Sequence, residues 1–229
     1  KVARQLIEPK LTQLGMAAAA DEPETVGELR ASLIGTLAVL GDQTIQAEMA
    51  KRFQAYAADR KAVDSSLVQA VIDGTAGAGN GTAYDTFCQM RKSAATPQEE
   101  ARFLFALTAF KDENLIARTL ASALAGEVRT QDLPSVLLKL FNNPTASRKT
   151  WTFVKDNWAY LVATLPLQGI IRLVEGVTAL VDPGLEAEVR EFLTTHTVKG
   201  SEKAVAQSLE LLRIACLLQK REQASLLSL

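Results

Sequence analysis

The sequence has a single histidine, His196, among its 229 residues. A metallopeptidase centre of the H-E-x-x-H type needs two imidazoles one helical turn apart, a glutamate beside them and a third ligand beyond. A serine or cysteine nucleophile also needs a general base, and His196 is the only ordinary candidate. We therefore predict that this chain contains no catalytic residue and holds no metal or other cofactor. His196 itself, in FLTTHTVKG at an expected helix end, is interpreted as a cap or a solvated residue.

Cysteine, net charge and long apolar runs are also scarce. Cys88 and Cys216 lie far apart and form no C-x-x-C motif, so a reduced, buried pair is favoured over a disulfide or a ligand role. A formal net charge of −1 gives no electrostatic case for nucleic acid as a partner. No apolar run approaches the roughly 18 residues of a membrane helix. Because no signal-peptide pattern is present either, we expect a cytoplasmic protein that contacts neither nucleic acid nor a membrane.

Four glycines are clustered at positions 74, 77, 79 and 81. A phosphate-binding loop requires a preceding strand and, in the Walker form, a closing G-K-[ST]. The segment before this cluster has helical spacing, and no lysine follows it. We therefore interpret the cluster as a plain loop that breaks a helix.

Helical periodicity dominates the rest of the chain. Apolar residues recur three and four positions apart in successive segments, and no useful stretch shows strand-like alternation. Helix starts are indicated at Thr25 with Glu28, Asp42, Thr96-Pro97 with Glu99, Asp112 and Asp182-Pro183. Helix pairs recur at roughly 32 to 40 residues, which is the period of HEAT-like or armadillo-like repeats. The predicted fold is all-α: an irregular helical-repeat solenoid of antiparallel helix pairs, forming one domain over residues 1–229.

The stretch from Gly126 to Leu161 organises this pattern. One helix ends at Gly126, Thr130 or Asp132 is expected to cap a second helix beside Pro134, and Asn143-Pro144 is expected to open a third. Residues Trp151, Val154 and Trp158 are spaced three, four and seven positions apart, which places them on one face of this third helix. We predict that both indoles are buried in the core.

This stretch resembles the C-terminal helical, ERAP-like domain of the puromycin-sensitive type of zinc aminopeptidase. The similarity lies in EVRTQDLP, NNP and TWTFVKDNW, and it extends weakly to LIEPKLTQLG, GNGTAYDTF, TPQEEARFLFAL and VAQSLELLRIACLLQKR. The resemblance implies a non-catalytic domain that closes over an upstream catalytic domain of the same polypeptide and forms part of the chamber that admits peptide substrates. Zinc is then expected in that upstream domain. We also expect the chain to be a fragment, since it opens on Lys1 in an apparent helix.

Three polar residues remain as candidates for substrate contact. Arg129, Gln131 and Asp132 stand at an expected helix junction, where side chains can project from the edge of a helical stack. They form either a local capping network or contacts to peptide in the chamber. For the whole chain, the alternative to the aminopeptidase domain is a free-standing helical-repeat scaffold that binds a protein or peptide in its concave groove.

Overall fold

The computed structural model describes residues 2–19 and 21–227, and within these ranges all regular structure is helical, without strands. The chain divides into two compact units, Lys1–Lys111 and Asp112–Leu229. The all-α class is thus confirmed. That residues 1–229 form a single domain stays a prediction.

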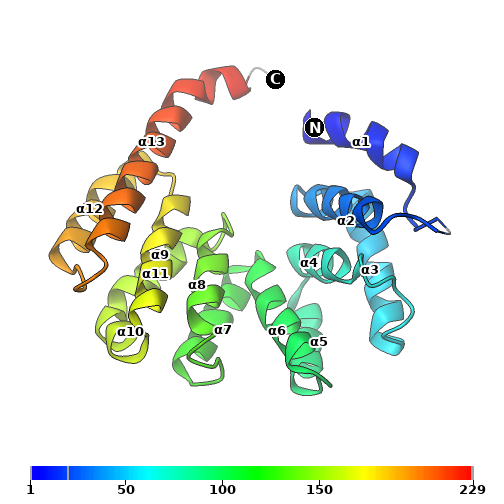
Figure 1. The fold of residues 1–229 in the computed structure, drawn as a ribbon, viewed down its shortest axis with the longest axis horizontal. Coiled ribbons are helices and arrows are strands. Elements are labelled where there is room, and N and C mark those ends of the chain that lie inside the picture. The colour runs from blue at the N-terminus through cyan, green and yellow to red at the C-terminus, as the bar shows by residue number, and fades with distance from the viewer. Residues whose placement is uncertain (1, 20, 228–229) are drawn as a thin grey trace. The chain divides into compact units, whose positions relative to one another are not determined.

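Unit 1 is built around α4. Its described helices are α1 (Val2–Leu14), α2 (Glu24–Val39), α3 (Gln43–Ala58), α4 (Val68–Ala78), α5 (Gly81–Lys92), α6 (Pro97–Ala106) and the short 3-10 turn η1 (Leu107–Ala109). Helices α2 and α3 both pack on α4, α1 packs on α2, and α5 packs on α6 (Figure 1). The core is aromatic: Phe87 stacks on Phe53 with ring centroids 4.7 Å apart and meets Phe103 and Phe110 edge-on.

Unit 2 is built around α11. Its described elements are α7 (Glu113–Leu124), α8 (Leu133–Phe141), α9 (Ser147–Asp156), α10 (Trp158–Thr164), α11 (Leu167–Gly176), η2 (Val177–Ala179), α12 (Pro183–Thr195) and α13 (Glu202–Leu227). Helices α8 and α13 pack on α11, α12 packs on α13, and α9 contacts both α7 and α8 (Figure 1). The amphipathic spacing explains this arrangement, because α8 buries Val136, Leu137 and Leu140 on one face.

Most of the expected helix starts are confirmed. Asp42 accepts a hydrogen bond from the Ile45 amide, Thr96 accepts one from Glu99, Asp112 caps α7 and Asp182 caps α12. The expected box at Thr25 is wrong: α2 begins at Glu24 after Pro23, without a side-chain cap. Here the fixed φ of proline sets the start of the helix.

The glycine cluster breaks the helix later than predicted, because α4 ends before Gly79 and α5 begins at Gly81. Gly74 and Gly77 lie inside α4, which continues to Ala78. A Cβ atom on Gly74 would lie 3.0 Å from both the Ala38 Cβ and the Met49 Cγ, so the glycine lets α2 and α3 approach α4 closely. Asn80 then caps α5 by accepting from the Ala83 amide at 3.1 Å.

The two tryptophans do not share one helix, which corrects the prediction for Trp158. Helix α9 ends at Asp156 and α10 begins at Trp158, because the Asn157 side chain bonds back to the Phe153 carbonyl oxygen and competes with helix continuation. Trp151 is 1% exposed and Val154 is buried, whereas Trp158 is half-buried. Both indoles nevertheless meet the ring of Phe192 edge-on, with centroids 5.3 and 5.6 Å away.

Three smaller expectations also need correction. Pro144 lies in the turn before α9, which begins at Ser147. Asp132 precedes α8 but makes no side-chain cap. Cys216 is buried as expected, but Cys88 is only half-buried, and neither forms a disulfide among the described residues.

Candidate functional site

The junction between α7 and α8 holds the three residues that the sequence singled out. Val128 is buried and anchors this turn, while Arg129 and Gln131 are exposed and Asp132 is half-buried. Gly126, at a φ of +74°, lets the chain turn sharply after α7. The Arg129 carbonyl oxygen accepts from the amides of Asp132 and Leu133 at 2.9 and 3.1 Å, which closes the turn.

Charge pairing within this turn joins Arg129 to Asp132. The Arg129 Nε donates to the Asp132 Oδ2 at 2.7 Å, and the two side chains are 43% and 15% exposed. The carboxylate therefore binds the guanidinium instead of the backbone amides of α8. Gln131 lies between them in sequence and is exposed. The structure thus brings the three residues to one exposed turn, as a local ion pair with a polar neighbour.

A second polar centre lies where α9 meets α12. The Trp151 Nε1 donates to the Glu188 Oε1 at 2.8 Å, and Lys155 pairs with the same oxygen. Hydrogen bonds from Lys155 and then Trp151 lower the pKa of the Glu188 carboxyl below its ordinary value. These contacts hold the buried indole in position, so we infer that they stabilise the fold and do not bind substrate.

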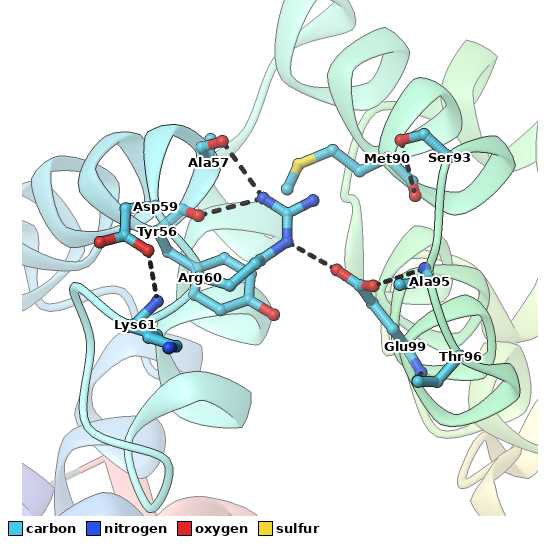
Figure 2. Close-up of polar contacts among 10 residues, drawn as sticks. All are labelled: Tyr56, Ala57, Asp59, Arg60, Lys61, Met90, Ser93, Ala95, Thr96 and Glu99. Carbon is cyan, nitrogen blue, oxygen red and sulfur yellow. Dashed lines mark hydrogen bonds and ion pairs between the residues drawn. The ribbon is translucent and has the colours of Figure 1, made fainter.

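Arg60 links the end of α3 to Glu99 of α6 by hydrogen bonds, which were not predicted from the sequence. Figure 2 shows its guanidinium between the end of α3 and the start of α6: it donates to the Tyr56 and Ala57 carbonyl oxygens at 3.0 and 3.2 Å and to the Glu99 Oε1 at 2.6 Å. The second Glu99 oxygen accepts from the Ala95 amide at 2.9 Å. Burial opposes ionisation of this carboxyl, but the Ala95 amide and Arg60 outweigh burial and lower its pKa.

Arg30 binds the end of α1 in a similar way, and this contact was not predicted from the sequence either. Its side chain is 1% exposed and pairs with Glu22. It also donates to the Gly15 and Leu14 carbonyl oxygens at 3.0 and 3.2 Å. Its partners are 8 to 16 residues away, so no local pattern marks it. The side-chain hydrogen bond from Arg30 lowers the pKa of Glu22.

No described part of the chain gathers three or more His, Cys, Asp or Glu side chains in a group that could hold a metal ion. His196 caps the end of α12, where it stacks on Phe192 at 4.2 Å and its Nδ1 lies 3.0 Å from the Phe192 carbonyl oxygen. Among the described residues, no helix combines the length and the hydropathy required to cross a bilayer.

Comparison with known proteins gives a consistent picture. The family model described as the ERAP1-like C-terminal domain matches residues 1–214. Aminopeptidase M1-B of Oryza sativa subsp. japonica is 30% identical over 201 residues, which cover 82% of this chain and 22% of the relative. Aminopeptidase M1-D of the same organism is 27% identical over 222 residues, covering 92% and 25%. The alanine/arginine aminopeptidase of Saccharomyces cerevisiae is 24% identical over 219 residues, covering 93% and 25%. The chain thus spans about a quarter of the length of the relatives it matches.

Proposed function

The chain belongs to the ERAP1-like C-terminal domain family of aminopeptidases, and from this we propose that it is the non-catalytic part of a zinc-dependent aminopeptidase. In this proposal the domain closes over an upstream catalytic domain of the same polypeptide and forms part of the chamber that receives peptide substrates. The observation that carries the proposal is the match of residues 1–214 to this family model, together with the similarity of the chain to aminopeptidases about four times as long.

Zinc belongs to the upstream domain in this proposal. The described side chains of this chain do not fit a zinc site, because they contain no cluster of ligating groups. When bound upstream, the metal would supply the activation of water that peptide hydrolysis needs. The part left to this chain is to enclose, orient and select the peptide.

The helical architecture suits that part. We propose that the helix pairs within each unit pack antiparallel as an irregular HEAT-like or armadillo-like stack, because such stacks present extended surfaces to peptides. The cytoplasmic location expected from the sequence stays a prediction.

Within this chamber, we assign substrate contact to the turn that holds Arg129, Gln131 and Asp132. A guanidinium offers a planar fork that matches the two oxygens of a peptide's terminal carboxylate. Arg129 is 43% exposed, so a carboxylate can reach it, and its pairing with Asp132 holds the guanidinium in place. Gln131 is an exposed residue, and a glutamine amide can both donate to and accept from a peptide backbone.

The test is Arg129→Ala in the intact enzyme. We expect kcat/KM to fall about tenfold, roughly 1.4 kcal/mol, for a peptide that spans the chamber and to stay unchanged for a single-residue reporter substrate. The matched control is Arg190→Ala, because Arg190 is 44% exposed and pairs with Glu186 one turn away on α12. If kcat/KM is unchanged for both substrates, Arg129 does not contact the peptide and the turn has only a structural role.

A further inference from the structure

Helix α13 is apolar on two opposite faces. Its inner face buries Val205, Leu209, Leu212 and Cys216 in unit 2. Four other large apolar side chains of the same helix are about half exposed: Leu211 at 56%, Ile214 at 53%, Leu217 at 57% and Leu218 at 49%. At about 100° per residue, these four fall in one stripe on the side opposite the buried face. We call Leu211, Ile214, Leu217 and Leu218 the outer stripe.

The outer stripe is compact and has polar ends. Gln207, one turn before it, and Glu210, directly before it, are exposed, and Arg221, paired with Glu222, follows it. An apolar centre with a charged rim is the pattern of an interface. Of the described side chains after Cys216, Leu217 to Gln223 and Ser225, none is buried. Figure 1 shows this last part of α13 running on past α12.

A helix with apolar side chains on two opposite faces needs a cover for the outer one. Helices that are apolar on all sides are normally enclosed. The outer face of α13 carries four large apolar side chains within eight residues.

The size of the outer stripe favours a cover from the same polypeptide. A stable interface between separate proteins buries about 1,000 Å² or more, which four half-exposed side chains cannot provide by themselves. A covalently linked domain needs much less area, because linkage gives an effective concentration of about millimolar. The relatives offer such a domain, since about three-quarters of their length lies outside the region matched by this chain.

We propose that the outer stripe of α13 is a surface on which the upstream catalytic portion of the same longer polypeptide docks. This inference rests on the proposed function and names the contact through which the two parts hold each other. The polar ends at Glu210 and Arg221 then fix the position of the docked portion along the helix.

Hydroxyl-radical footprinting of the intact longer protein tests the docking. Leu124 and Leu167 serve as internal references, because they are 41% and 43% exposed in unit 2, less than any residue of the outer stripe. Docking predicts that the outer stripe is oxidised about fivefold more slowly than these leucines, since solvent access governs the reaction. Oxidation of the outer stripe at least as fast as the references would overturn the proposal. Protection that disappears on dilution, together with a halved mass, would assign the surface to a second copy and also overturn it.

A variant pair provides the second arm. Ile214→Glu with Leu218→Glu should release the docked portion and raise the rate of limited proteolysis between the two parts about tenfold. Leu124→Glu makes the same chemical change on α7 and should leave that rate unchanged. Circular dichroism checks that each variant is folded. Equal proteolysis of the two variants would contradict the inference.

The two proposals fail in different ways. If the intact enzyme selects long peptides through Arg129 but its outer stripe is oxidised freely, only the docking is wrong. If the native protein is no longer than this chain, the proposed function is wrong and the docking falls with it.

Discussion

Single arginines hold helix ends together in unit 1. Arg30 binds the last carbonyl groups of α1, Arg60 binds those of α3, and each also pairs with a glutamate from another segment. A guanidinium suits this position because its donors satisfy unpaired carbonyl oxygens and its charge complements the negative end of the helix dipole. Arg129 differs, since it pairs with Asp132 in the same turn and its own side chain is 43% exposed.

The tryptophans give a residue-scale prediction. Trp151→Ala should lower the free energy of unfolding by about 3–5 kcal/mol, because it empties a fully enclosed site. Trp158→Ala should cost less, about 1–2 kcal/mol, because that indole is half-buried. Urea denaturation measures both. Equal losses for the two variants would contradict the placement of Trp158 in α10.

Fluorescence provides a control for this difference. In the Trp158→Phe variant, Trp151 should emit at short wavelength, and in Trp151→Phe the remaining Trp158 should emit further to the red.

At the scale of helices, local signals were predictable and contacts between helices were not. The caps at Asp42, Thr96 and Asp112 follow from one residue type and its neighbours. The space that favours glycine at position 74 of α4 is limited by Ala38 and Met49, which are distant in sequence. The ion pair between Arg60 and Glu99 joins residues 39 positions apart. The pairing of Arg129 with Asp132 could have been read from its three-residue spacing, but the break at Asn157 was hidden by apolar periodicity on both sides.

The glycines that end α4 and begin α5 give a prediction for these elements. A Cβ on Gly79 would lie 2.6 Å from a ring carbon of Phe110 and 2.9 Å from the Thr75 carbonyl oxygen, whereas nothing lies within 4 Å of one on Gly81. Gly79→Ala should therefore destabilise the protein by about 1–3 kcal/mol. Gly81→Ala, two residues away, should be neutral or slightly stabilising. Chemical denaturation measures the free energy of unfolding of both variants. Similar changes in the two variants would show that contact with Phe110 does not exclude a side chain at position 79.

For the whole chain, acid should be destabilising. The pKa values of Glu22, Asp64, Glu99 and Glu188 are all lowered by hydrogen bonds and neighbouring charges in the fold. A carboxyl with a lowered pKa contributes stability above its unfolded value, about 4.3 for glutamate, and loses it as the pH falls through the folded value. We expect the urea concentration at the unfolding midpoint to stay constant between pH 7 and about pH 5.5. It should decrease when the pH is lowered below about 4.5.

Glu99→Gln isolates one of these charges, because glutamine can keep the hydrogen bond from Ala95 while losing the ion pair with Arg60. The variant should be less stable than the unmodified chain at pH 7, and the difference should vanish by about pH 3. A difference that is constant across this range would exclude the charge as its cause.

The central claim concerns a scale larger than this chain: that it is one domain of an aminopeptidase and not a free-standing scaffold. The most direct test is the intact mass of the native protein, combined with the sequence that precedes Lys1. The account predicts a polypeptide about four times as long, with an H-E-x-x-H motif upstream of residue 1. A native product of about 24.7 kDa, without that motif, would contradict it.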